Sequence, residues 1–397
     1  MSARCEFRED VQAWFQENAP RNWRSAVRGM SREQYEQWQR DWLHLLNTRG
    51  FAAPHVPQEW GGGGFTLDDQ VVIYEEWARA DAPPLGLYLI SLLHVPGTLL
   101  AAGTEEQKKR YLRDAIEGTV WCQGFSEPGS GSDLASLRTR AVRDGDDWVV
   151  TGQKIWSSHA QSAEYCILLA RTDPASRGSA GISYFILDMR SPGVDVRPIR
   201  QNTGHQEFCE IFLDDVRIPA GNMIGPEGEG WKVAQSTLQT ERGPIAVENI
   251  ERIAAGLDRL RGELSRAGAT VADGTLARLV ELTARVTAVR SLAKDVVAAL
   301  AAGRSSAGNR TSLLKIAYTE LLQDVSRLGT EILGEDGLVD PQQPYRLGMI
   351  SGDWMIDWLG SWGSTIAAGT NEIQRNLVAE RLLGLPREPR VGQPARG

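Results

Sequence analysis

The spacing of apolar residues changes twice along the chain and divides it into three segments. In the first 120 residues the spacing is that of helices. Ser31 and Gln34 form a capping box, which predicts the start of a helix that stops near Gly50. The apolar stripe of this helix consists of Tyr35, Trp38, Trp42, Leu45 and Leu46. A second capping box, from Thr104 to Gln107, opens a helix that ends at Gly118. The four glycines at 61–64 predict a loop between the two helices.

From about residue 121 the apolar runs become short and rich in β-branched and aromatic residues. Turn signals such as Asp144-Gly145 and Pro192-Gly193 separate them. The predicted strands are 148–151, 165–169, 182–187, 194–197 and 208–213. Their spacing favours a compact antiparallel sheet or barrel.

The helical period returns near Gly230, now in longer stretches. One apolar stripe consists of Leu282, Val286, Val289, Ala293, Val296 and Leu300. A second consists of Leu314, Ala317, Leu321, Val325, Leu328 and Ile332. Long helices with such seams pack as a bundle. We therefore expect three domains: an N-terminal helical domain (1–120), a middle β domain (121–229) and a C-terminal helical bundle (230–397).

Composition and charge narrow the function classes. With 397 residues the chain exceeds one ordinary core, and 42% hydrophobic with 24% charged residues is typical of a globular protein. The net charge of −8 argues against nucleic-acid binding. We expect neither a membrane span nor a signal peptide, which favours the cytoplasm. The cysteines lack metal-ligand spacing, so no metal site is expected; they are Cys5, Cys122, Cys166 and Cys209.

Three polar segments stand out from this framework. The segment Trp121–Asp133 crowds glycines and serines around two acids, and could present N–H groups and hydroxyls to an acceptor-rich ligand. The segment 152–158 places two hydroxyls directly after Trp156. The segment 367–384 contains Thr370 as a predicted helix cap. Taken one at a time, they could equally be a turn-rich linker, a strand with a core tryptophan and a capped surface helix.

In this order and spacing, the segments resemble the acyl-CoA dehydrogenase family. The likeness rests on Val56-Pro-Gln-Glu-Trp-Gly-Gly62, the Glu-Pro-x-x-Gly-Ser-Asp pattern of 127–133, Gly-Gln-Lys-Ile-Trp at 152–156 and Gly-Thr-Asn-Glu-Ile-Gln-Arg at 369–375. It runs along nearly the whole chain. The resemblance implies an α+β multidomain fold: an N-terminal α-helical domain, a middle antiparallel β-barrel and a C-terminal four-helix bundle. It also implies FAD, held between barrel and bundle and across a subunit interface.

The resemblance assigns roles to individual residues. Phe125 and Ser126 would contact the edge of the isoalloxazine, Trp156 would pack on the flavin, and Ser158 would hydrogen-bond near its reactive nitrogen. Ser132 would lie near the pyrophosphate and the mouth of the acyl-CoA channel, in contact with cofactor and substrate. At the bundle, Thr370 and Glu372 would meet FAD, and Gly334–Gly337 would approach the dinucleotide of the neighbouring subunit.

The catalytic base is assigned by position. Medium- and short-chain members of the family carry it directly before the Gly-Thr of the C-terminal motif, where this chain has Ala368. Isovaleryl-type and long-chain members carry it on a bundle helix directly before an arginine, which matches Glu241 and Arg242. We therefore predict Glu241 as the base, although an isolated Glu-Arg pair is usually a surface pair. Arg242 would be a structural or CoA-side partner. Pro244 predicts a kink just after Glu241.

The resulting expectation is an FAD-dependent acyl-CoA dehydrogenase that desaturates a thioester-bound acyl group. The family partner is an electron-transferring flavoprotein, and a homotetramer or dimer is expected. Three alternatives stay open. The acyl group could be carried by a carrier protein or the flavin used for oxygenation, or the chain could be the flavin subunit of a heteromeric dehydrogenase. The sequences of several motifs resemble those of bacterial members that act on branched or bulky acyl groups, including steroid side chains.

Overall fold

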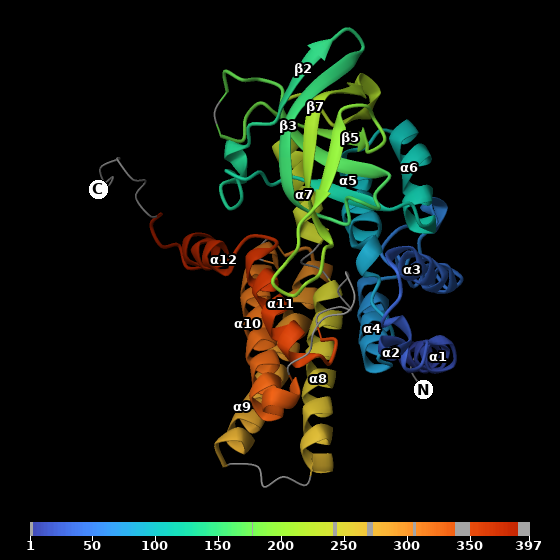
Figure 1. The fold of residues 1–397 in the computed structure, drawn as a ribbon, viewed down its shortest axis with the longest axis vertical. Coiled ribbons are helices and arrows are strands. Elements are labelled where there is room, and N and C mark those ends of the chain that lie inside the picture. The colour runs from blue at the N-terminus through green and yellow to red at the C-terminus, as the bar shows by residue number, and fades with distance from the viewer. Residues whose placement is uncertain are drawn as a thin grey trace.

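The computed structural model consists of a sheet at one end, long helices extending from it, and shorter helices packed alongside (Figure 1). The residues that it describes are 3–176, 178–240, 244–267, 273–304, 307–337 and 350–387. No helix in those ranges combines the length and apolar character needed to span a bilayer.

The N-terminal part is helical. They are α1 (Ala3–Asn18), α2 (Trp23–Val27), α3 (Arg32–Asn47), α4 (Leu67–Arg79), α5 (Val95–Ala102) and α6 (Glu105–Glu117). Both predicted capping boxes are confirmed, at Ser31 for α3 and Thr104 for α6. Gly118 ends α6 in the left-handed conformation (φ 119°), which glycine adopts without steric cost. The apolar stripe of α3 faces a core that includes Phe15, Trp42 and Trp77.

The middle part is one sheet of eight described strands. They are β1 (Trp121–Gly124), β2 (Arg140–Asp144), β3 (Asp147–Ser158), β4 (Tyr165–Arg171), β5 (Ile182–Asp188), β6 (Val194–Pro198), β7 (Phe208–Pro219) and β8 (Met223–Ile224). The order is β6-β7-β3-β2-β4-β5-β8, with β1 beside β4. Each predicted strand is present, and β3 and β7 are longer than predicted because they pair along most of their length.

The sheet is mixed, whereas we expected an antiparallel one. β1 runs parallel to β4, and Arg140 of β2 pairs with Arg171 of β4 in the same sense. The physical reason is the long connection between β1 and β2, which lets the chain return to the sheet beside β4 in the direction of β1. The sequence hid β1 because its four residues end in Gly124. A side chain there would press against the Cys166 sulfur, with Cβ only 2.9 Å away.

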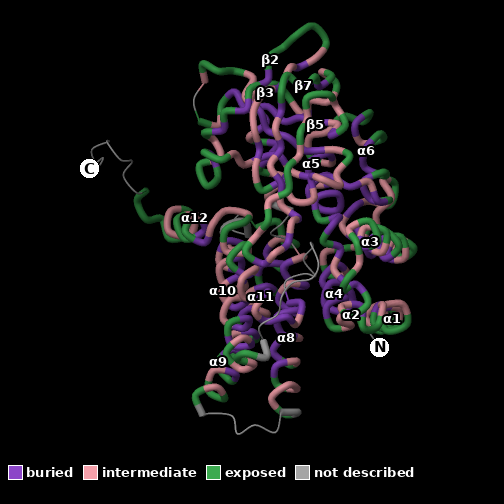
Figure 2. Tube along the Cα trace, viewed as in Figure 1, coloured by how far each residue is buried: buried purple, intermediate pink, exposed green. Residues whose placement is uncertain are grey.

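The C-terminal part is helical. Its helices are α7 (Gly230–Thr240), α8 (Ile245–Ala267), α9 (Asp273–Ala301), α10 (Ala307–Leu333), α11 (Trp354–Ile366) and α12 (Asn371–Leu377). Both predicted apolar stripes lie in the core shared by α8 to α11, seen as buried segments in Figure 2. α7 ends at Thr240 and α8 begins at Ile245; the kink predicted just after Glu241 falls on 241–243, outside the described residues, and stays a prediction.

A buried cluster of hydroxyls joins the three parts. Thr98 of α5 lies 2.6 Å from Thr237 of α7, measured between their Oγ1 atoms, and the Tyr184 hydroxyl of β5 lies 3.1 Å from Thr237. Thr98 also donates to the His94 carbonyl at 2.7 Å. All three side chains are fully buried, so these mutual bonds replace those that water would make. This hydroxyl cluster fixes α7 against both the sheet and α5.

Candidate functional site

A β-bulge in β3 turns Trp156 out of the sheet. The pairing of β3 with β7 shifts between Lys154 and Ser157, and Trp156 has φ 64°. The residue is 56% exposed, and its ring meets Phe208 edge-on with 6.1 Å between ring centroids. Because a bulge re-aims side chains and such a conformation is costly for tryptophan, this exposed indole is a candidate ligand platform. The alternative that Trp156 belongs to the core is wrong.

The two serines after Trp156 differ in their surroundings. Ser158 is half-buried and pairs with Phe208 of β7. The Ser157 hydroxyl is fully buried and has no hydrogen-bond partner among the described residues. Buried hydroxyls are normally satisfied, so β3 ends in a place with unused hydrogen-bonding capacity.

The segment after β1 lies against the same stretch of β3. The amide of Ile155 donates to the Ser126 carbonyl at 3.0 Å, which brings Ser126 next to Trp156 in space. Phe125 is buried and packs edge-on against Tyr184 at 5.7 Å. The structure thus places Phe125 and Ser126, directly after β1, beside the stretch of β3 that carries Trp156 and Ser158. Ser132 lies farther along the loop and is exposed.

A buried ion pair holds this loop and escaped the sequence analysis. The Lys154 ammonium donates to the Glu127 carboxylate at 2.9 Å and to the Phe125 carbonyl at 3.1 Å. The Lys154 side chain is completely buried. One signal was available in the sequence: along β3, Lys154 has the same parity as the core residues Trp148 and Val150, so strand alternation places it inside.

The C-terminal motif is a sharp turn held from two sides. Ala368 and Gly369 have φ 55° and 83°. The Gln374 amide donates to the Ala368 carbonyl at 3.0 Å, and the buried Lys315 ammonium donates to the Gly369 carbonyl at 3.0 Å and to Asn371 Oδ1 at 2.7 Å. The alanine methyl carries no proton-accepting group, so residue 368 cannot act as a base.

Thr370 caps α12 and Glu372 lies in its first turn; the helix projects sideways from the long helices (Figure 1). The Thr370 hydroxyl accepts from the Ile373 amide at 3.3 Å, which confirms the predicted N-cap. Glu372 is exposed, and backbone N–H donation at the helix start together with the Thr370 hydroxyl lowers its pKa. Within the described residues, no hydrogen bond joins these two side chains to Phe125, Ser126 or Trp156. Glu241 and Arg242 lie outside the described residues.

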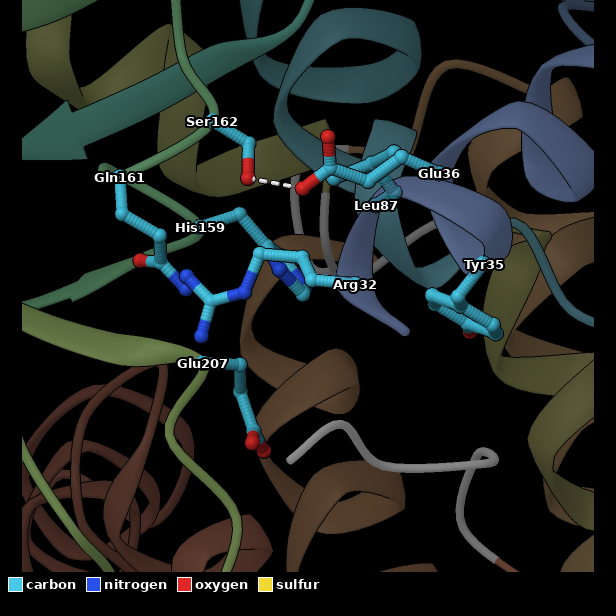
Figure 3. Close-up of a pocket in the computed structure, with 8 residues that line it drawn as sticks. All are labelled: Arg32, Tyr35, Glu36, Leu87, His159, Gln161, Ser162 and Glu207. Carbon is cyan, nitrogen blue, oxygen red and sulfur yellow. Dashed lines mark hydrogen bonds between the residues drawn. The ribbon is translucent and has the colours of Figure 1, made fainter. Parts of the chain in front are cut away.

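A small polar pocket lies between α3 and the end of β3, next to Ser158 (Figure 3). It contains about 270 Å³ of empty space, including its opening to solvent. Burial, reinforced by the Arg32 charge, lowers the pKa of His159 to about 4, so this histidine is neutral at pH 7. The Ser162 hydroxyl donates to Glu36 across the pocket. The lining residues are Arg32, Tyr35, Glu36, Leu87, His159, Gln161, Ser162 and Glu207. Such a polar lining does not suit an alkyl chain.

Known protein families match this chain from residue 3 to residue 383, in three consecutive parts. Models of three acyl-CoA dehydrogenase domains match: the N-terminal domain over 3–119, the middle domain over 122–216 and the C-terminal domain over 228–383. The acyl-CoA dehydrogenase IpdE1 of Mycobacterium tuberculosis is 38% identical, over 96% of this chain and 98% of that protein.

Two solved structures share the fold at 31% sequence identity. The Tcur3481-Tcur3483 steroid ACAD has a TM-score of 0.84, covering 97% of this chain and 98% of its own. The ChsE4-ChsE5 complex from Mycobacterium tuberculosis has a TM-score of 0.79, covering 98% of this chain and 99% of its own.

Proposed function

The chain belongs to the acyl-CoA dehydrogenase family and is an FAD-dependent oxidoreductase, and we propose that it introduces an α,β double bond into an acyl-CoA thioester. The observation that carries the proposal is the exposed Trp156 indole on its bulge, flanked by Ser126 and Ser158. An aromatic face offers stacking area to a flat ring system, and flanking hydroxyls supply hydrogen bonds at its edge.

The residues present fit FAD. Phe125, Ser126, Trp156 and Ser158 would hold the isoalloxazine, Ser132 would lie near the pyrophosphate, and Thr370 with Glu372 would complete the site from the bundle side. The unused Ser157 hydroxyl supports this assignment, because it leaves hydrogen-bonding capacity next to Trp156 in the strand. When bound, FAD supplies the acceptor for the hydrogen that leaves the β-carbon as hydride.

The protein's own part in the reaction is removal of the α-proton, which we assign to Glu241. That proton is only weakly acidic, so the thioester oxygen needs hydrogen-bond donors and the carboxylate needs a desolvated setting that raises its pKa. The assignment is supported by the methyl group at Ala368 and by the placement of α7, whose last turns precede Glu241 and are fixed by Thr237. Arg242 would stabilise the CoA side of the substrate.

The architecture we propose for the active assembly is the family's: a barrel formed by the middle sheet, a four-helix bundle formed by α8 to α11, and FAD shared across a subunit interface. Electrons would pass to an electron-transferring flavoprotein. The sideways projection of α12 from the long helices supports a site completed by a neighbouring subunit (Figure 1).

A bulky acyl group of the steroid type is our proposed substrate class, supported by the steroid ACAD among the similar structures. The ChsE4-ChsE5 complex favours a second possibility, in which this chain is the flavin-binding and base-bearing subunit of a heteromeric enzyme.

The test is anaerobic reduction of the protein's own flavin. The purified full-length protein should show the absorbance of oxidised FAD, and a matching acyl-CoA should bleach it within one turnover. A panel of straight, branched and steroid-type acyl-CoAs would identify the acyl group. Complete absence of bleaching across CoA thioesters, with bleaching by the same acyl groups on a carrier protein, would reject the CoA assignment. Activity that requires O₂ and an added reductant would indicate an oxygenase instead.

A further inference from the structure

One carboxylate holds together the two ends of the loop that joins β1 to β2; we call this junction the neck of the loop. Glu127 lies at the start of this loop, and its two oxygens accept from the backbone amides of Arg138 (2.7 Å) and Thr139 (2.8 Å) at the end. Lys154 reaches the same carboxylate at 2.9 Å from β3, underneath the loop. The neck therefore depends on a charged side chain at each of two positions, and we call Glu127 and Lys154 the neck pair.

In the neck pair, the charge of each side chain stabilises the charged form of the other. Burial on its own raises the pKa of Glu127, but the Lys154 charge and the amide donors outweigh it and lower that pKa overall. Burial lowers the pKa of Lys154, and Glu127 opposes this shift. Removing one partner leaves the other charge buried without compensation, which costs far more than replacing both.

Above the neck, the loop is organised by its own backbone and serines. Glu127 and Ser130 exchange two backbone hydrogen bonds of 3.0 Å. The hydroxyls of Ser130 and Ser136 lie 2.6 Å apart, and Ser136 donates to the Asp133 carbonyl at 2.7 Å. The tip, with Ser132, is exposed. These bonds shape the tip, whereas the neck pair, together with the backbone bond from Ile155 to Ser126, ties the base of the loop to the strand that carries Trp156.

We infer that Glu127 and Lys154 are positioning residues for the dinucleotide. They hold the loop in the position in which Phe125, Ser126 and Ser132 meet FAD, and they do not touch the cofactor themselves. The geometry that carries this is the shared attachment of Lys154, which binds the Glu127 carboxylate and the Phe125 carbonyl with one ammonium group. The inference rests on the proposed FAD contacts of this loop.

The experiment measures the FAD dissociation constant of the full-length protein by flavin fluorescence, together with its melting temperature. Lys154→Met should weaken FAD binding tenfold or more at pH 7.5. The loss should shrink at pH 5.5, because protonation neutralises the stranded Glu127. The double variant Lys154→Met/Glu127→Gln should bind FAD more tightly than Lys154→Met alone. If Lys154→Met does not fold, Glu127→Gln carries the test, with an expected weakening of threefold or more.

Arg252→Met is the matched control. Arg252 and Glu248 form a buried ion pair in α8, and Arg252 also donates to the Ala82 carbonyl at 3.0 Å, which reproduces the carboxylate-plus-carbonyl contacts of Lys154. This variant should lower the melting temperature and leave FAD affinity unchanged. The inference is overturned if the neck-pair variants also lose only thermal stability and keep FAD affinity within twofold. Alanine variants of Phe125 and Ser126 that keep the FAD affinity of the wild type would instead reject the proposed FAD contacts of the loop.

Discussion

Single residues near the candidate site adopt backbone conformations that side chains usually avoid. Trp156, His159 and Ala368 have φ values of 64°, 56° and 55°. Each such conformation costs on the order of 1–3 kcal/mol and persists only where the surroundings impose it. At residue 156 the bulge against β7 does so, and at residue 368 the Gln374 and Lys315 donors hold the turn. Both segments that we assign to FAD thus contain such a residue; Asn22, Asp81 and Asp215 adopt similar φ values elsewhere in the described chain.

The base assignment predicts the effect of one isosteric change. Glu241→Gln should reduce kcat by about 10²–10⁴-fold, because the amide cannot accept the α-proton, while FAD remains bound. Stopped-flow flavin reduction measures the chemical step directly. Glu229→Gln, an exposed acid just before α7, is the control and should reduce flavin at the normal rate. Normal reduction by Glu241→Gln would show that another residue is the base.

We predict that His159 of the polar pocket makes the free energy of unfolding depend on pH. The pKa of His159 is about 4 in the folded protein and about 6.5 when unfolded, so between pH 6.5 and 4 the unfolded chain binds the proton more readily than the folded one. Its contribution is complete above pH 6.5 and falls as the pH drops, by at most about 3 kcal/mol near pH 4. Urea unfolding at pH 7 and 4.5 should therefore show a smaller decline for His159→Asn than for the wild type. A constant difference between the two proteins at both pH values would contradict this.

Among the helices and strands, those predicted most accurately have local signals. The boxes at Ser31 and Thr104 define helix starts through bonds within four residues, so the sequence alone reveals them. β1 depends on its parallel partner β4, which is more than forty positions away, and no local pattern encodes that pairing. The same holds for the bulge at Trp156, since alternation along β3 cannot show where β7 shifts its register.

The close approach of α10 and α11 gives a prediction at this scale. A methyl group at Gly329 of α10 would overlap the Trp354 indole, which is fully buried. Gly329→Ala should lower the free energy of unfolding by about 1–3 kcal/mol despite the better helix propensity of alanine. Gly274→Ala in α9, where nothing lies within 4 Å, should change it by less than about 1 kcal/mol. Equal effects in chemical denaturation would refute the packing argument.

At the scale of the whole molecule, the C-terminal helices leave large apolar residues exposed. Trp362 and Ile366 lie one turn apart on α11 and are 54% and 62% exposed, and Leu383 and Leu385 follow α12. Such residues together are typical of an association surface. The sequence predicted an oligomer through its family resemblance, but the surface itself emerges only when the helices are packed.

Ile366→Glu should therefore reduce the molecular mass in analytical ultracentrifugation and lower FAD occupancy. Val142→Glu is the matched control, because Val142 is 57% exposed on β2, far from α11 in the chain. It should leave both the mass and the flavin content unchanged. A wild-type monomer, or an Ile366→Glu variant with the mass of the wild type, would contradict the assignment of this surface.

The hydroxyl cluster of Thr98, Tyr184 and Thr237 has a consequence for biosynthesis. A ribosome makes its three members far apart in time, and the first two would sit without their shared partner in an apolar core until residue 237 has emerged. The N-terminal helices therefore cannot complete their docking as they are made. The junction between the N-terminal helices and the sheet is therefore completed only when α7 arrives, so the order of synthesis sets the order in which the first two parts of the molecule close on each other.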